Sequence, residues 1–225
     1  MATRISLHLL FSLLLVVTAA SAQQSTNVPA RPAQKVMPMR LLKPLAASAP
    51  DVTQLAVGAL APDFISHDLL GKTVRLSDFK DKVLVLDFWA TWCGPCLASL
   101  PHTETVATRY QDQGVVILAV CTGDTRAAFE QWGKANQAKY PGIAFASDPN
   151  ERGSTTFDER ASWKLYGVSG IPAQFVIGRD GKVVAVLGGY SKDDRRLEAG
   201  LARAGIKVDP AVTAKGEEQF KQDGS

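Results

Sequence analysis

Two cysteines separated by a glycine and a proline, Cys93 and Cys96, are the residues of this sequence best suited to chemistry. They follow an apolar run, residues 83–89, and Pro95 suits the first turn of a helix because its missing N–H would have no partner there. We therefore expect the pair at a junction between a strand and a helix. The positive end of the helix dipole favours thiolate over thiol, which predicts a nucleophilic Cys93.

The spacing of the two cysteines permits thiol–disulfide exchange. Their sulfurs can reach each other without a backbone movement, so we expect Cys93 to attack a disulfide and Cys96 to resolve the mixed disulfide that forms. A cysteine pair can also be half of a zinc site, but a second pair of ligands is missing. After the N-terminal segment the sequence adds one isolated cysteine, Cys121, and two histidines, His67 and His102. We expect no metal site and no cofactor.

The elements that must position the cysteines alternate between apolar strands and helices. Strands are predicted at residues 82–90, 115–120, 143–146, 173–177 and 182–187, and helices at 95–110, 125–139, 158–166 and 192–204. The first two strands are apolar throughout, which indicates a parallel pair that is covered on both faces and joined by a right-handed crossover. Residues 70–73 are typical of a turn, with a short extended run after it to Leu76, and residues 178–181 are typical of a hairpin turn between the last two strands. The pattern predicts an α/β fold.

The composition is that of an ordinary globular protein and gives no sign of nucleic-acid binding. Of the 225 residues, 46% are hydrophobic and 21% are charged, with a formal net charge of +3. That is enough apolar material for one domain with its own core. No cluster of basic residues accompanies the weak positive charge, so nucleic acid is not an expected partner.

The first 22 residues have the features of a signal for export. Arg4 precedes an apolar run, residues 9–17, and the small residues 20–22 form a cleavage site. The apolar run is short for a bilayer span, so we expect cleavage after Ala22, with an uncleaved membrane anchor as the alternative. The prediction is an exported protein, periplasmic rather than secreted or membrane-anchored, that meets the membrane only through an uncleaved anchor.

The regions on either side of the predicted domain are polar or rich in proline. Residues 23–56 contain prolines among alanines and polar residues and are expected to be a disordered linker. Residues 57–208 are expected to form the domain. The polar tail, residues 209–225, is expected to fray.

Two motifs resemble those of a known family. Residues 86–96 read Leu-Asp-Phe-Trp-Ala-Thr-Trp-Cys-Gly-Pro-Cys, and residues 166–172 read Tyr-Gly-Val-Ser-Gly-Ile-Pro. Together they resemble a thioredoxin-fold protein. The signal peptide, the segment at 58–64 and an extra helix and strand at 125–148 make the chain most similar to the exported TlpA/ResA-like redoxins. The resemblance covers about residues 57–208.

The resemblance implies a fold and an activity. The fold would be thioredoxin-like, with a central mixed sheet flanked by helices, an N-terminal extension and a central helix–strand insertion. The activity would be thiol–disulfide exchange that reduces disulfides of envelope proteins, with an upstream dithiol as electron donor. The dipeptide Gly94-Pro95 matches that of thioredoxin, which favours a reductant over an oxidant.

The resemblance also assigns roles to residues near the cysteine pair. Asp87 lies within an apolar strand, where a carboxylate is costly without a partner or a function, and it matches the buried proton acceptor of thioredoxins. The lysine that partners this aspartate in thioredoxin would lie in the strand at 115–121, which contains none. Ile171 and Pro172 match a cis-proline loop that binds substrate. We expect the substrate-binding surface to include Trp92, Gly94, Pro95, Ile171 and Pro172.

The sequence supports limited predictions for three other residues near the motif. Ser99 occupies a position where many TlpA/ResA-like proteins have a glutamate, which weakens any link to cytochrome c maturation. Cys121 is expected to be buried and inert, with a redox role as the alternative. His102 is expected to be a solvated residue of the helix rather than a catalyst.

Two other functions use similar residues. A peroxiredoxin-like peroxidase shares the fold but needs threonine or serine three residues before its reactive cysteine, where this chain has Ala90. A copper chaperone could hold Cu(I) with the two thiolates, because soft sulfur ligands suit this ion. Such chaperones usually add a distant histidine, and none follows His102.

Overall fold

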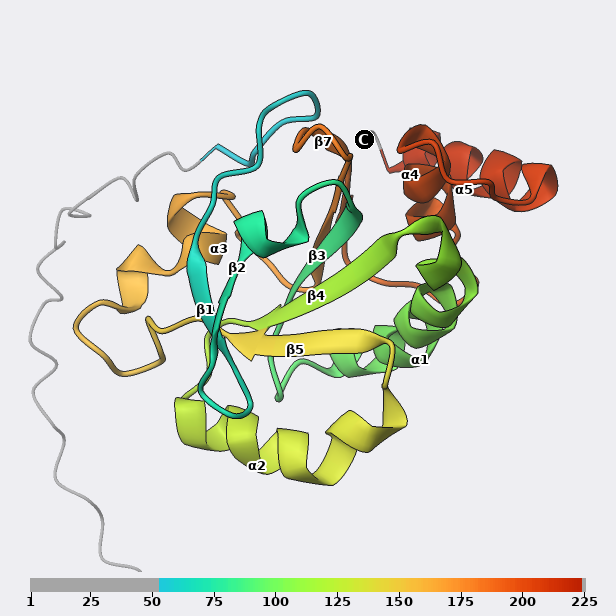
Figure 1. Ribbon diagram of the computed structural model, residues 1–225. Coiled ribbons are helices and arrows are strands. Elements are labelled where there is room, and N and C mark those ends of the chain that lie inside the picture. The colour runs from blue at the N-terminus through green and yellow to red at the C-terminus, as the bar shows by residue number, and fades with distance from the viewer. Residues whose placement is uncertain (1–52, 224–225) are drawn as a thin grey trace, which may run out of the picture. The chain divides into compact units, whose positions relative to one another are not determined.

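A computed structural model describes residues 53–223, which form one sheet with helices against its faces (Figure 1). The strands are β1 Ile65–Asp68, β2 Thr73–Arg75, β3 Val83–Trp89, β4 Val115–Cys121, β5 Ile143–Ser147, β6 Ala173–Ile177 and β7 Val183–Gly188. The helices are α1 Gly94–Tyr110, α2 Arg126–Asn136, α3 Ala161–Lys164, α4 Arg196–Arg203 and α5 Pro210–Gln222. Short 3-10 turns cover Leu76–Phe79, Gln111–Gln113, Gln137–Lys139 and Phe157–Glu159.

The sheet is mixed, as the sequence predicted. Its strand order is β2-β1-β5-β4-β3-β6-β7. Strands β3, β4 and β5 run parallel at the centre, and the remaining pairings are antiparallel. Helix α1 makes the crossover from β3 to β4, and α2 with β5 forms the predicted helix–strand insertion. The hairpin between β6 and β7 is also confirmed.

Strand β3 alternates its side chains between two apolar cores. Val83, Val85 and Trp89 belong to the core that includes residues of α1, α2, α4 and α5. Leu84, Leu86 and Phe88 belong to the core on the other face, which includes residues of α3 and Phe64. This period of two is the strand repeat, and burial on both faces explains why the whole strand is apolar. Asp87, between Leu86 and Phe88, therefore points to the face that α1 covers.

Strand β1 was not predicted, whereas β2 corresponds to the short extended run expected after the turn at residues 70–73. Strand β1 pairs with β2 and also with β5, where His67 lies opposite Ser147. Strand β1 is too short and too polar to show a period of two. Its second partner, β5, lies far along the chain.

The predicted fraying tail is wrong, because residues 210–222 form helix α5. The Asp209 side chain accepts hydrogen bonds from the backbone of Ala211 and Val212, and Pro210 follows it at the first helical position. Phe220 is 1% exposed and packs in the core shared with α4. A Cβ at Gly216 would lie 2.2 Å from the Arg195 carbonyl oxygen, so glycine allows the close approach.

Helix α5 is expected to contribute to the stability of the domain. Replacing Phe220 by alanine should lower the free energy of unfolding by about 3 kcal/mol, because it empties a buried aromatic site. Lys221→Ala, on the exposed side of the same helix, should change it by less than about 0.5 kcal/mol. Urea denaturation of both variants measures the difference. Equal urea midpoints for the two variants would show that the burial of Phe220 in α5 adds nothing to the stability of the domain.

Two N-terminal predictions cannot be compared with the structure. The export signal, residues 1–22, and nearly all of the linker, residues 23–56, lie outside the described part of the chain. Within residues 53–223, no helix combines the length and apolar character needed to cross a bilayer.

Candidate active site

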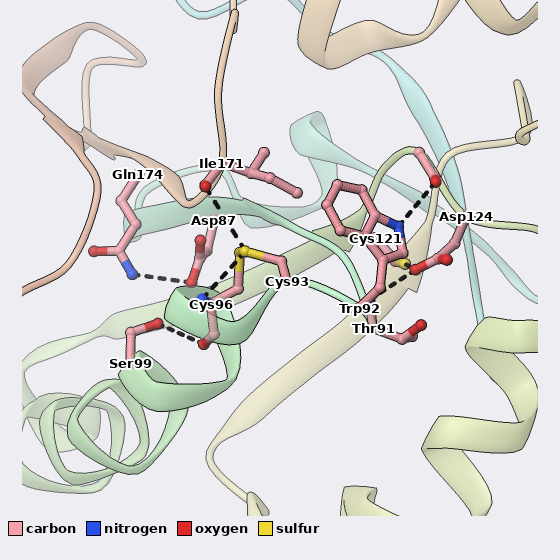
Figure 2. The surroundings of a disulfide bond; sticks show 11 residues. Asp87, Thr91, Trp92, Cys93, Cys96, Ser99, Cys121, Asp124, Ile171 and Gln174 are labelled. Atoms are coloured by element: carbon pink, nitrogen blue, oxygen red, sulfur yellow. Dashed lines mark hydrogen bonds between the residues drawn. A yellow bond between two sulfur atoms is a disulfide. The ribbon is translucent and has the colours of Figure 1, made fainter. Parts of the chain in front are cut away.

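The two cysteines lie where β3 gives way to α1, and a disulfide joins them (Figure 2). Cys93 is the N-cap residue of α1, and its sulfur accepts a hydrogen bond from the Cys96 backbone N–H at 3.2 Å. Pro95 lies in the first turn, as predicted. This geometry places the Cys93 sulfur at the positive end of a helix of 17 residues. In the reduced protein the same position favours a thiolate.

Both cysteines are almost fully buried. Cys93 is 5% exposed and Cys96 is 1% exposed, although Gly94 and Pro95 between them are exposed. Trp92 is 56% exposed, and its indole Nε1–H donates to the Gly123 carbonyl oxygen at 3.2 Å. A substrate disulfide would therefore reach the Cys93 sulfur through an apolar, partly covered entrance.

The loop before β6 lies against the disulfide. Its Ile171–Pro172 peptide bond is cis, as the motif predicted. The Ile171 carbonyl oxygen lies 3.7 Å from Cys93 Sγ, and Figure 2 shows it directed at that sulfur. The Pro172 carbonyl oxygen accepts from the Gly189 backbone N–H at 2.9 Å, which ties the loop to the end of β7. The structure thus brings together Cys93, Cys96 and the proline loop.

Asp87 is buried on the α1 face of the sheet and has one hydrogen-bond partner. Its Oδ2 accepts from Gln174 Nε2 at 2.9 Å, whereas its Oδ1 has no partner. Burial raises the pKa of Asp87 to about 6, and the hydrogen bond from Gln174 opposes that rise only in part. The carboxylate is therefore poised to take up or release a proton near neutral pH.

The partner of Asp87 comes from β6 and not from β4. Strand β4 contains no lysine, and Gln174 lies directly opposite Asp87 on β6, in the antiparallel pair with β3. Its Nε2 also lies 3.5 Å from Thr103 Oγ1 on α1. Only the register of β3 against β6 reveals this partner.

The inner face of α1 carries a row of polar side chains that belongs to the site. Cys96, Ser99 and Thr103 are spaced by three and four residues, so they share one side of the helix, and all three are buried. Ser99 Oγ donates to the Cys96 carbonyl oxygen at 2.7 Å. Through Thr103 and Gln174, this face of the helix is connected to the Asp87 carboxylate.

His102 differs from its predicted role. It was expected to be solvated, but its side chain is 16% exposed and its Nε2 lies 3.0 Å from the Glu198 carboxylate of α4. Arg195 also donates to Glu198, at 2.9 Å. Burial opposes ionisation of Glu198, yet the bonds from His102 and Arg195 bring its pKa below the ordinary value. The group joins α1 to α4, which the spacing within α1 could not indicate.

Cys121 is buried, as expected, and its thiol donates to Asp124. It is 3% exposed, and its Sγ lies 3.2 Å from Asp124 Oδ2. That oxygen also accepts from the Thr91 backbone N–H at 2.7 Å, just before the cysteine pair. Burial, and then the neighbouring Asp124 carboxylate, raise the pKa of the Cys121 thiol far above the ordinary value. Such a thiol is a poor nucleophile.

Alkylation should separate the three cysteines. After reduction of the folded protein, iodoacetamide is expected to modify Cys93 and to leave Cys121 unmodified, because the start of α1 favours the Cys93 thiolate whereas burial and the Asp124 carboxylate raise the pKa of Cys121. Peptide mass spectrometry measures the labelling, and the same reaction in denaturant is the control that should label all three. Labelling of Cys121 as fast as Cys93 in the folded protein would contradict this assignment.

Comparison with known families agrees with the geometry of the site. The family model described as Redoxin matches residues 56–201, which includes the disulfide, Asp87 and the proline loop. The chain belongs to the redoxin family.

Curated relatives of this redoxin carry one activity in their names. A "Thiol-disulfide oxidoreductase ResA" of Geobacillus thermodenitrificans is 34% identical over 143 residues, which is 63% of this chain and 75% of that protein. The ResA of Bacillus subtilis is 33% identical over 135 residues, 60% of this chain and 69% of that protein.

Solved structures place the redoxin in the same group. A crystal structure assigned as a thiol:disulfide interchange protein DsbE of Chlorobium tepidum is 34% identical. Its TM-score is 0.56, and the match covers 67% of this chain and 99% of that one. The exposed lipoprotein thioredoxin Etrx1 of Streptococcus pneumoniae is 33% identical with a TM-score of 0.51, covering 63% of this chain and 99% of the other. The thioredoxin-like fold predicted from the two motifs is confirmed.

Proposed function

We propose that this redoxin is an exported thiol-disulfide oxidoreductase that reduces disulfides of envelope proteins by dithiol exchange. The observation that carries the proposal is the disulfide between Cys93 and Cys96 at the start of α1, with the cis-proline loop against it. A disulfide in this position is the product of the reaction, and the dithiol is its reactant.

The first step is attack by Cys93. In the reduced enzyme its thiolate displaces one sulfur of the substrate disulfide, so the substrate S–S bond breaks and an enzyme–substrate disulfide forms. The displaced substrate sulfur leaves as a thiolate and takes a proton from solvent. The dipole of α1 and the Cys96 backbone N–H, which reaches Cys93 Sγ in the oxidised structure, favour the thiolate form of Cys93.

The second step is release by Cys96. Its sulfur attacks Cys93, breaks the mixed disulfide and expels the second substrate thiolate, which is then protonated. The enzyme is left with the disulfide seen in the structure, and the substrate has gained two electrons and two protons. Cys96 is 1% exposed, so its proton needs an internal acceptor, and we assign that role to Asp87.

The substrate is held by residues around the entrance. We propose that Trp92, Gly94 and Pro95 contact it on one side of the disulfide, and that Ile171 and Pro172 contact it on the other. Trp92, Gly94 and Pro95 are exposed and Ile171 is partly exposed, whereas Pro172 and the two cysteines are buried. A polypeptide in this position could present its disulfide to Cys93 while Trp92 excludes water.

The proposed direction of electron transfer and the proposed cellular compartment each depend on one feature of the sequence. The Gly94-Pro95 dipeptide favours reduction, so an upstream dithiol must return two electrons to the enzyme after each turnover. Residues 1–22 favour export to the periplasm, where protein disulfides occur. The description of Etrx1 as an exposed lipoprotein is in line with activity outside the cytoplasm.

The proposal is tested by a disulfide-reduction assay. Wild-type protein with a dithiol donor should accelerate the reduction of insulin above the rate of the donor alone, whereas a Cys93→Ser variant should not. Wild type no faster than the donor would overturn the proposed function. Substrates are then identified in envelope extracts with a Cys96→Ser variant, which should retain them as mixed disulfides.

A further inference from the structure

A cavity of about 390 Å³ lies beside the disulfide and is not used by the exchange chemistry itself. Trp92, the residue before Cys93, forms part of its wall. So does Ile171, whose carbonyl oxygen lies 3.7 Å from Cys93 Sγ. A polypeptide that contacts both Trp92 and Ile171 at the disulfide would therefore lie against this cavity.

The charged residues that line the cavity are both arginines, Arg152 and Arg160. The Arg152 guanidinium lies over the Trp92 ring, 5.0 Å from its centroid. Within residues 53–223 it has no ion-pair partner. It is thus an exposed cation that lies over the aromatic residue next to Cys93.

Arg160 is held by more contacts within the fold than Arg152. Its guanidinium lies 4.1 Å from the centroid of the Phe157 ring, and its Nη1 donates to the Phe157 carbonyl oxygen at 2.9 Å. Asp158 lies 3.6 Å from the same nitrogen but is 89% exposed, so water weakens that pair. We therefore assign the leading role to Arg152 and a supporting role to Arg160.

Nearby carboxylates already have partners within the fold. Asp124 accepts from the Thr91 backbone N–H and the Cys121 thiol. Asp148 is buried and accepts from the Ala161 backbone N–H at 2.7 Å. Neither carboxylate lines the cavity, so its walls present positive charge and aromatic surface to whatever enters.

We propose that the cavity binds a segment of the substrate protein that carries an aspartate or glutamate within a few residues of the disulfide cysteine. The substrate carboxylate would pair with Arg152, and apolar atoms beside it would pack on Trp92. This inference rests on the proposed function and specifies the substrate class: disulfide proteins that are acidic next to the reactive cysteine. Opposite charges at such an entrance raise the rate of encounter and select among partners.

The test uses peptides joined by one disulfide and identical except for the residue two positions after the cysteine. With glutamate there, kcat/KM for reduction by the full-length enzyme should be about fivefold higher than with glutamine, and lower still with lysine. The Arg152→Gln variant should lose the preference for glutamate, so that it reduces the glutamate and glutamine peptides at equal rates. Arg152→Lys should retain most of the preference, because the charge remains.

A matched control removes the same charge elsewhere. Arg109 is exposed in the last turn of α1, at the opposite end from the disulfide, so Arg109→Gln should keep the full preference. Higher salt should reduce the preference in the wild type. A further arm replaces the peptides by glutathione disulfide, a small molecule that also carries carboxylates.

The outcomes separate this inference from the proposed function. If no peptide is reduced in a Cys93-dependent way, the proposed function is wrong. If all three peptides are reduced at one rate, the proposed function stands and the acidic-substrate inference is wrong. Dependence on Arg152 that is seen with glutathione disulfide but not with the peptides would also overturn it, because the occupant would then be a small molecule.

Discussion

Replacing Cys93 by serine is expected to abolish the reduction of protein disulfides. A serine hydroxyl cannot form the mixed disulfide, and Cys96 cannot take over because it is 1% exposed beneath the helix start. The rate should fall to that of the dithiol donor alone, a loss of more than about 1,000-fold for the enzyme-catalysed part. Insulin reduction, followed by turbidity, measures it. A Cys93→Ser enzyme that keeps the wild-type rate would exclude Cys93 as the nucleophile.

The matching variant Cys96→Ser should fail in a different way. Cys93 can still attack, but the internal release step is missing, so enzyme and substrate should accumulate as a disulfide-linked pair. Non-reducing gel electrophoresis should show this adduct, and added dithiol should remove it. Cys121→Ser is the control, since its buried thiol is not part of the exchange, and it should turn over normally. An adduct formed by Cys93→Ser but not by Cys96→Ser would reverse the two roles.

Replacing Asp87 by asparagine is expected to slow turnover and to change its pH dependence. Without the carboxylate, the proton of Cys96 has no buried acceptor, and the release step should slow by about 100-fold. In the wild type, the rate of release should rise with pH through a pKa of about 6, the value to which burial raises Asp87. Single-turnover kinetics between pH 5 and 8 should show this inflection in the wild type and its absence in Asp87→Asn.

A substitution that only disturbed the structure would not remove the inflection near pH 6 from the rate of release. Asp148→Asn is a suitable control, because Asp148 is also buried with a raised pKa but bonds Ala161 and Asn150 rather than groups at the disulfide. It should leave the inflection near pH 6 unchanged. If Asp87→Asn retained the inflection, another group would be the proton acceptor.

The same substitution should stabilise the oxidised protein at neutral pH. Folding raises the pKa of Asp87 from 3.8 to about 6, so the native state holds this proton more tightly than the unfolded state. Stability is therefore greatest below about pH 4 and falls as pH rises to about 6, by roughly 3 kcal/mol for this group. Asparagine avoids that loss, although its amide N–H would lack a partner at the Oδ1 position.

The net gain for Asp87→Asn is expected to be about 1–2 kcal/mol at pH 7 and to become a loss of about 1 kcal/mol at pH 4, where Asp87 is largely protonated and the unpaired amide still costs stability. Urea denaturation at both pH values measures it. A variant that is less stable than the wild type at pH 7 would show that the buried carboxylate is better solvated than its surroundings suggest. The gain in stability, together with the slower release, would identify Asp87 as a residue kept for function at a cost in stability.

Local patterns in the chain were enough to predict the reactive disulfide and the sheet around it. The spacing of Cys93 and Cys96, with Pro95 between them, requires a helix start, and the apolar run at 83–89 requires a strand covered on both faces. These inferences were confirmed because each depends on residues close in the chain, where backbone chemistry and side-chain period act directly. The helix α5 was missed because its apolar residues are few, and its burial depends on α4.

The surroundings of the disulfide depended on contacts between distant segments. Gln174 became the partner of Asp87 through the register of β3 and β6, and His102 became a hydrogen-bond partner of Glu198 because α4 packs against α1. Arg152 lies over Trp92 only because the loop after β5 folds back to that ring. A pKa, a buried thiol or a charged cavity is a property of neighbours in space. The two cysteines and the exchange chemistry proposed for them could therefore be predicted from the chain itself, whereas the environment of Asp87 and the charge at the entrance required the folded structure.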